Sequence, residues 1–449
     1  MEHRPNSRLH RLVQASGFSQ AQLASEIRRV AAERGQVLAC GQSSVSRWLS
    51  GTRPRPLAGT FLLEALTRRL GRPVSAVDAG LTEADIPVSG TGLDLSGEAD
   101  WAPALAALLR ADLDPVRRRL LTAGTYSLTA LTLPAALPTP AKPPDTTKAS
   151  AADVPLRARV EQLDMMARHF ADAAKTLGGG PVRTALAGYL TDPVTGWLNA
   201  PAPWPLHRQL LIGAARLTLL LGTMTADDGH DALAQHYHHL SARMAAEAGD
   251  VGLYSISLRS MAAHAYDLGQ RTPAVLHLSE HAADTARQAP RPVRAYAQAH
   301  LATAAAARND RHTALAALAA AERFHEQADH VPGPFTAYPL AALHYQRAQT
   351  LTALGDAPGA IGAYTAALRL RPAAERHAKA LTRAHLAETL LAQGYLDAAL
   401  AHWTRFLDEV PHLGSARATR RLTALRQLLT PHRCHRPATL LLERATTLR

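Results

Sequence analysis

Apolar residues recur along this chain at intervals of three and four, the spacing that places side chains on one face of an α-helix. Near the N-terminus the pattern occurs in short segments separated by glycine, and Val45, Trp48 and Leu49 form one such apolar face. From about residue 155 onward the chain is rich in alanine and leucine with the same periodicity, and strand patterns are almost absent. The sequence therefore predicts an all-α fold.

Glycine and proline divide the chain into three predicted parts. Residues 1–87 contain short helical segments, and residues 151–449 contain long, alanine-rich helices. Residues 88–150 contain a helical segment and end in LPAALPTPAKPPDTTKAS, a proline-rich stretch that cannot continue a helix and that we interpret as a connector. With 449 residues, 47% of them hydrophobic, the chain is long enough to form more than one core.

The third part repeats itself. Two consecutive units, beginning at Ala341 and Ala380, place small residues where paired helices would cross closely, an aromatic residue in the next groove and a proline after the second helix. Two degenerate copies begin near Ser255 and Ala295. The matching positions are Ala348, Gly355, Ala360, Tyr364, Ala367 and Pro372 in the first unit and Ala387, Gly394, Ala399, Trp403, Phe406 and Pro411 in the second. These units are similar to the tetratricopeptide (TPR) consensus, which implies a curved α-solenoid with a concave surface.

The segment GQSSVSRWLSGTRPRP, residues 41–56, combines an apolar inner face with an unusually polar outer face. A purely structural helix would gain more from alanine, leucine and glutamate at its outward positions. Residues 1–73 hold twelve arginines against four glutamates, within a chain of formal charge +12. All but four of the 49 basic residues are arginine, as in a GC-rich genome, so the local excess is more informative than the total. A polyanion would dock at this end.

Upstream, FSQAQLA begins a predicted helix that Ser19 caps and whose Leu23, Ala24 and Ile27 face inward. With SSVSRWLSGTRP as the second helix and its following loop, residues 6–81 resemble the helix-turn-helix domain of Cro and lambda-repressor-like (Xre-type) regulators. The interval from Ala24 to Val45 is about eleven residues longer than is usual in that family. Followed by TPR-like repeats, the arrangement resembles the helix-turn-helix TPR regulators common in streptomycetes.

The resemblance implies a sequence-specific DNA-binding transcriptional regulator in the cytoplasm, associated with the nucleoid. Its recognition helix would enter the major groove of double-stranded DNA. The predicted base contacts are Gln42, Ser43, Ser44, Ser46 and Arg47. The predicted phosphate contacts are Ser19, Gln20, Arg53 and Arg55. The TPR-like region would form a homodimer and sense a peptide or small-molecule effector.

A second interpretation stays open, in which the chain is a TPR adaptor that binds protein partners and the N-terminal domain is structural. The serines of residues 41–56 would then be ordinary helix caps, and the arginines a consequence of genomic composition. In both interpretations Trp48 is a core anchor rather than a base-stacking group. Selection of a preferred duplex from random DNA separates the two interpretations.

No enzymatic or cofactor site is predicted, because the chain has no P-loop, nucleophile elbow, zinc-protease or kinase motif. The histidine-rich stretch at residues 230–239 and the HRCHR segment at 432–436 lack the ligand spacing of a zinc site, and we expect them to lie on solvated faces. Cys40 and Cys434 are not expected to form a disulfide. We expect no membrane span, since LLIGAARLTLLLGTM is short and interrupted by Arg216.

Overall fold

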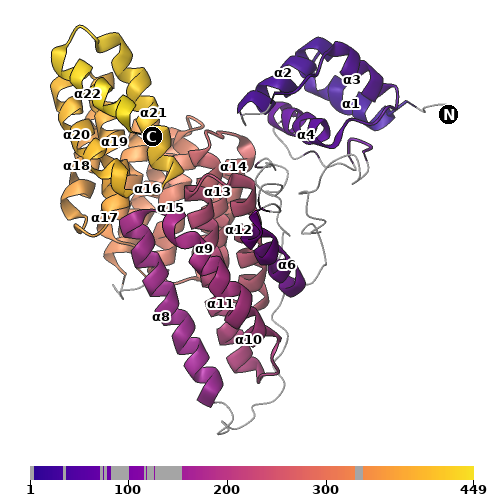
Figure 1. Cartoon of the computed structure of the whole chain (residues 1–449), viewed down its shortest axis with the longest axis vertical. Helices are drawn as coiled ribbons and strands as arrows, with labels where there is room; N and C mark the ends of the chain where they lie inside the picture. The colour runs from indigo at the N-terminus through magenta and orange to yellow at the C-terminus, as the bar shows by residue number, and fades with distance from the viewer. Residues whose placement is uncertain are drawn as a thin grey trace. The chain divides into compact units, whose positions relative to one another are not determined.

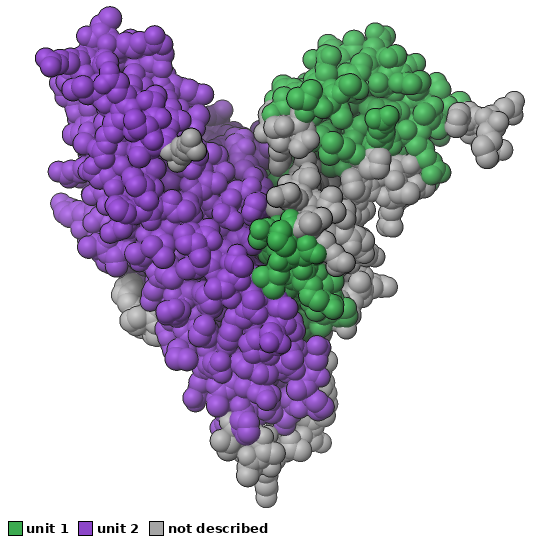
Figure 2. Space-filling view, in the orientation of Figure 1, with its two compact units in different colours: residues 1–136, 272–277 green, residues 137–271, 278–449 purple. Residues whose placement is uncertain are grey.

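The computed structural model describes residues 5–33, 37–70, 74, 78–81, 101–115, 118, 126, 154–328 and 337–448. All regular secondary structure in these ranges is helical, which confirms the predicted all-α class (Figure 1). The chain divides into two compact units: unit 1 comprises residues 1–136 and 272–277, and unit 2 comprises residues 137–271 and 278–449 (Figure 2). The predicted connector lies largely outside the described residues, except for helix α6 (Trp101–Leu113).

Four helices of unit 1 share one core: α1 (Ser7–Ser16), α2 (Gln20–Glu33), α3 (Gln42–Leu49) and α4 (Pro56–Leu70). The proline that begins α4 is favoured at a first helical position, where its missing N–H has no helical acceptor in any case. The apolar faces predicted from the helical spacing meet in this core. Its fully buried side chains include Leu9, Leu23, Ile27, Val45, Phe61, Leu62 and Leu66.

Asn6 connects three segments of unit 1 and thereby fixes the position of α3. Its side-chain oxygen accepts a hydrogen bond from Leu9 N–H at 3.0 Å and caps α1. Its Nδ2 donates to the carbonyl of Ala79 at 2.8 Å, and its backbone N–H donates to the carbonyl of Leu49 at 2.9 Å. The end of α3 is therefore attached to the beginning of α1.

From residue 154 onward the chain forms a helical solenoid in which successive helices pack against one another (Figure 1). The closest pairs are α11 with α12, α15 with α16, α17 with α18 and α19 with α20. The helices are α8 (Val154–Leu177), α9 (Gly180–Tyr189), η4 (Leu190–Val194), α10 (Thr195–Asn199), α11 (Trp204–Asp227), α12 (Asp231–Glu247), α13 (Val251–Asp267), α14 (Pro273–Thr285), α15 (Arg291–Ala306), α16 (Arg311–Glu326), α17 (Leu340–Ala353), α18 (Ala357–Leu370), α19 (Arg376–Ala392), α20 (Leu396–Glu409), α21 (Ala416–Leu429) and α22 (Arg436–Thr447).

The positions that defined the predicted repeats have the expected packing roles. Ala348 and Ala360 are fully buried where α17 crosses α18, and Trp403 is fully buried in the next pair. Gly355 ends α17 with a φ of 78°, a left-handed conformation that glycine adopts at little cost. Asn309 occupies the corresponding turn between α15 and α16 with a φ of 62°, which asparagine tolerates better than most residues. The degenerate copy therefore keeps the same turn.

Helix α8 packs against both α11 and α19, so the first helices of unit 2 lie beside its last repeats. The turn after α8 pairs with the segment before α21: Gly414 N–H donates to the carbonyl of Leu177 at 2.9 Å, and Gly180 N–H donates to the carbonyl of Gly414 at 3.0 Å. A Cβ atom at Gly179 would lie 2.5 Å from the carbonyl oxygen of Met224, so only glycine fits there. We call this junction the seam.

Asp227, a buried residue at the end of α11, is the polar centre of the seam. Its carboxylate accepts hydrogen bonds from Gly179 N–H at 2.8 Å and from the Ser415 hydroxyl at 2.6 Å, and His377 Nε2 lies 3.3 Å away. Burial alone would raise the pKa of Asp227. Its hydrogen bonds and the electrostatic attraction of His377 and Arg417 outweigh that effect and lower the pKa to about 2. The ionised carboxylate therefore stabilises the seam.

Helix α11 contains the apolar stretch that was expected to be too short for a membrane. The helix has 24 residues with a mean hydropathy of 1.3 over its most apolar window, so its length alone would suffice to cross a bilayer. The helix extends beyond the apolar stretch, residues 210–224, on both sides. However, 67% of that window is buried inside the protein. This burial is typical of a core helix of a soluble protein.

The histidines of α12 do not lie on a solvated face, and that prediction was wrong. His238 is 1% exposed and its ring meets the edge of the His264 ring at 5.9 Å. Burial lowers the pKa of His236 to about 4. The physical reason is that α12 packs against α11 on one side and α13 on the other. Within the described ranges, histidine, cysteine and acidic side chains form no group of three that could hold a metal ion.

Candidate nucleic-acid interface

Helix α2 begins with a reciprocal pair of hydrogen bonds between Ser19 and Gln22. Gln22 N–H donates to Ser19 Oγ at 3.2 Å, and Ser19 N–H donates to Gln22 Oε1 at 2.8 Å. This capping box satisfies two N–H groups that the helix itself leaves unpaired. The predicted cap at Ser19 is confirmed, and Leu23, Ala24 and Ile27 are buried as expected.

Replacing Ser19 by alanine is expected to destabilise the start of α2 by about 1 kcal/mol, because the Gln22 N–H loses its acceptor. Native-state hydrogen exchange of the α2 amides measures this change. Ser25→Ala is the matched control, since Ser25 is exposed on the same helix beyond its first turn. Equal protection of the α2 amides in wild type and Ser19→Ala would contradict the assigned cap.

Helix α3 has one face in the core and one face in solvent. Val45, Trp48 and Leu49 are 0%, 8% and 4% exposed, which confirms that they point inward and that Trp48 is a core anchor. Helix α3 packs against both α2 and α1 through this face. The outward side chains are Gln42, Ser43, Ser46 and Arg47, all of them exposed, and Ser44, which is half-buried.

The hydrogen bonds of α3 distinguish its outward residues. The Ser44 hydroxyl accepts from Gly41 N–H at 3.5 Å, so this side chain turns back toward its own helix start. Arg47 Nε donates to the carbonyl of Ser43 at 3.3 Å, and no carboxylate among the described residues pairs with its guanidinium. The side chains of Gln42 and Ser46 project from the same exposed face. Of the five predicted base contacts, Ser44 is therefore the least available.

The loop after α3 alternates arginine and proline. Gly51 turns the chain with a φ of 100°, and Thr52 N–H donates to the carbonyl of Arg47 at 2.9 Å. Pro54 is buried, whereas Arg53 and Arg55 on either side of it are exposed. The loop therefore has one buried residue, Pro54, between two exposed arginines next to the end of α3.

The acidic side chains described on α2 and α4 pair with arginines of their own helices. The two acidic residues of α2 and α4 whose side chains are described are already paired: Glu26 accepts from Arg29 Nε at 2.9 Å, and Glu64 from Arg68 Nε at 3.0 Å. The hydrogen bond from Arg29 lowers the pKa of Glu26, so this pair stays ionised at neutral pH. Arg47 is thus left with its positive charge on the exposed face of α3.

The structure places the other predicted phosphate contacts and accounts for the long interval before α3. Ser19 and Gln20 stand at the start of α2, Ser19 exposed and Gln20 half-exposed. Helix α2 has 14 residues, and residues 37–41, which precede α3, contain no helix. Sequence reasoning missed Asn6, whose role in attaching α3 depends on contacts with residues 43 and 73 positions away.

The N-terminal region matches a known protein family. Residues 9–82 match the protein family described as the SP15 N-terminal domain. The match covers nearly all of α1 and the whole of α2, α3 and α4, and its description names neither a helix-turn-helix nor a tetratricopeptide family. A search of the curated proteins finds no match to the chain.

Proposed function

We propose that this protein is a sequence-specific DNA-binding transcriptional regulator that acts at the nucleoid in the cytoplasm. The observation that carries the proposal is the geometry of α3: its inner face is fixed in the core of unit 1, and its outer face presents Gln42, Ser43, Ser46 and Arg47 to solvent. A short rigid helix with a polar face is the element that fits a major groove. In the proposal, unit 2 holds two copies together and senses the signal.

Each exposed residue of α3 has a donor or acceptor set that suits base edges. The Arg47 guanidinium can pair bidentately with guanine, and the Gln42 amide with adenine. The hydroxyls of Ser43 and Ser46 accept or donate at several base edges. Arg53 and Arg55 follow α3 directly and supply charge for the phosphates on the rim of the groove.

In vitro selection of random duplexes by the full chain tests the proposal. We expect enrichment of a specific motif, arranged as two half-sites about one helical turn of DNA apart, or a multiple of it, if two copies bind together. The adaptor interpretation predicts recovery of duplexes without a common motif. That outcome would overturn the proposed function.

The double substitution Arg53→Ala and Arg55→Ala is expected to weaken binding to all duplexes alike. The slope of log affinity against log salt concentration should fall by about two units, because about one counterion is released per neutralised phosphate. Fluorescence anisotropy at a series of KCl concentrations measures the slope. Arg405→Ala, which removes an exposed arginine on α20, is the charge control. A changed base preference with an unchanged slope would contradict the assigned role of the loop.

A further inference from the structure

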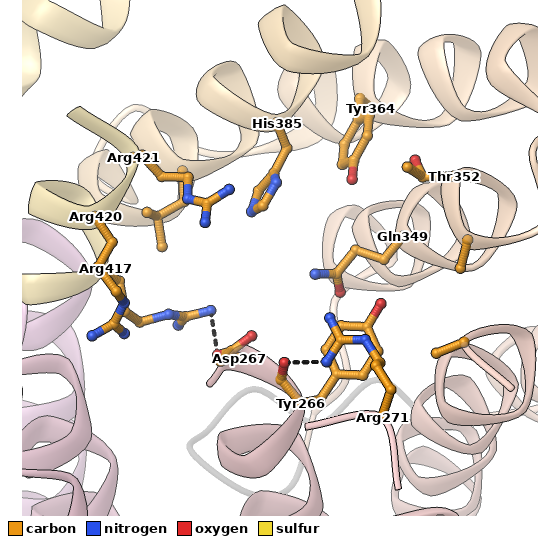
Figure 3. Close-up of a pocket in the computed structure, with 13 residues that line it drawn as sticks. Tyr266, Asp267, Arg271, Gln349, Thr352, Tyr364, His385, Arg417, Arg420 and Arg421 are labelled. Carbon is orange, nitrogen blue, oxygen red and sulfur yellow. Dashed lines mark hydrogen bonds and ion pairs between the residues drawn. The ribbon is translucent and has the colours of Figure 1, made fainter. Parts of the chain in front are cut away.

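The inner helices of the solenoid line a partly open cavity of about 420 Å³ in unit 2 (Figure 3). Its walls come from α13, α17, α18, α19 and α21 and from the segments after α13 and α15, and they include Tyr266, Arg271, His385, Arg420 and Arg421. A second cavity of about 270 Å³ adjoins the first and shares five lining residues with it. These volumes lie in or near the range of small-molecule sites.

Arginines dominate the charged side chains of the larger cavity. Figure 3 shows Arg417, Arg420 and Arg421 of α21 along one side, across the cavity from Gln349 and Arg271. Two of these arginines are neutralised by carboxylates. The Arg417 guanidinium lies 2.8 Å from Asp267, and Arg421 donates to both carboxylate oxygens of Glu388 at 3.0 and 3.1 Å.

The other two arginines pair with no carboxylate in the part of the chain that the structure describes. The Arg271 guanidinium lies over the Tyr266 ring, 3.4 Å from its centroid, and donates to the carbonyls of Tyr266 and Gln270. Arg420 makes no ion pair or side-chain hydrogen bond with any residue that the structure describes. Both arginines line the same cavity, so the cavity carries positive charge that no carboxylate among the described residues pairs with.

The adjoining cavity is lined by Arg259, Arg417 and Arg420 and by Asp227 and Asp267, whose carboxylates are engaged by Ser415 and Arg417 respectively. The Arg259 guanidinium lies 3.9 Å from the Tyr296 ring centroid and donates to the Tyr296 hydroxyl at 2.8 Å and to Gln346 Oε1 at 3.1 Å. No carboxylate among the described residues pairs with it. The Tyr338 side chain is only 4% exposed, and its hydroxyl has no hydrogen-bond partner among the described residues. A buried hydroxyl without a partner costs free energy, which a bound ligand would recover.

From this arrangement we infer that the cavity binds a small acidic molecule with at least two negative charges on carboxylate or phosphate groups. Arg420 and Arg271 bind one anionic group by charge-assisted hydrogen bonds, and Arg259 with the Tyr338 hydroxyl binds the second. Arg417 and Arg421 are held in place by their own carboxylates and shape the wall. The inference rests on the proposed function, because this molecule would be the signal that the regulator senses.

Isothermal titration of the full chain without DNA, in buffered KCl, tests the inference. The probes are inorganic pyrophosphate and citrate, with sulfate as the smaller reference anion. We expect saturable binding of at least one probe, stronger than that of sulfate. Arg420→Gln and Arg271→Gln should each weaken it roughly tenfold or more, since each removes a charge-assisted contact. Arg405→Gln, an exposed arginine outside the cavity, should leave binding unchanged.

Binding of pyrophosphate alone would assign a phosphorylated ligand, and binding of citrate alone would assign a polycarboxylate. The inference would be overturned if sulfate bound as tightly as pyrophosphate and citrate. It would also be overturned if both arginine variants bound the probes as tightly as the wild type. Binding of a tetraglutamate peptide but of neither small anion would also overturn it, in favour of an acidic peptide.

Circular dichroism verifies the fold of each variant. If Arg420→Gln does not fold, the affinity of Arg271→Gln for the probes serves as the test. DNA selection is a separate readout, so a chain that selects a motif but binds no anion retains the proposed function and loses only this inference.

Discussion

Replacement of Asp227 by alanine is expected to lower the free energy of unfolding of unit 2 by about 3–5 kcal/mol. The substitution leaves the Gly179 N–H, the Ser415 hydroxyl and His377 without their shared acceptor in a buried site. It also breaks the connection between the first helices of the solenoid and the segment before α21. Urea denaturation followed by circular dichroism measures the loss.

Asp408→Ala is the matched control for this prediction. Asp408 is an aspartate as well, but it forms an ion pair with Arg444 at 2.7 Å and its side chain is 56% exposed. Exposed ion pairs contribute about 1 kcal/mol or less, so this variant should unfold close to the wild type. Equal, small effects of Asp227→Ala and Asp408→Ala would show that the seam does not stabilise the solenoid.

The stabilisation by Asp227 is expected to depend on pH with a defined sign. Because its folded pKa of about 2 is below the ordinary value of 3.8, its contribution is complete above pH 3.8 and is lost as the pH falls toward 2. A depression of this size corresponds to about 2 kcal/mol. The difference in stability between wild type and Asp227→Asn should therefore narrow between pH 4 and pH 2. A stability difference that stayed constant across that range would contradict the assignment of an ionised Asp227 carboxylate in the seam.

The double substitution Gln42→Ala and Arg47→Ala is expected to remove most of the discrimination between the selected duplex and random DNA. Each bidentate base contact contributes about 1–3 kcal/mol of discrimination, so the two together correspond to roughly a thousandfold if both contacts form. Both side chains are exposed and outside the core, so the fold of unit 1 should persist. Competition binding with specific and random duplexes measures the ratio.

Arg28→Ala is the control, because it removes an exposed arginine from α2 and leaves α3 intact. Any weakening it causes should be the same for specific and random duplexes, as expected for a contact to phosphate. If the double variant kept its preference at every base position, α3 would not be the recognition helix.

The features that sequence predicted are those encoded by local spacing. The cap at Ser19, the inward face of Val45 and Trp48, and the close helix crossing at Ala348 each follow from residues within a few turns of one another. The arginine-proline alternation at residues 53–56 also belongs to this group, because the order of residues alone predicts a loop.

The features that sequence did not predict depend on contacts between distant residues. Asp227 and Ser415 are 188 positions apart, and no local pattern indicates that they meet. The His238 ring is buried because α12 packs between α11 and α13, which the spacing of histidines does not reveal. Arg420 is one arginine among many in an arginine-rich chain, and only its position in the cavity distinguishes it.

A crystal structure of the full chain with the duplex that it selects is the most direct test of the central claim, that the outer face of α3 reads DNA. The proposal predicts α3 in the major groove, with Gln42 and Arg47 within hydrogen-bonding distance of base edges and Arg53 and Arg55 near phosphates. A complex in which α3 faces away from the groove, or in which another element supplies the base contacts, would contradict it.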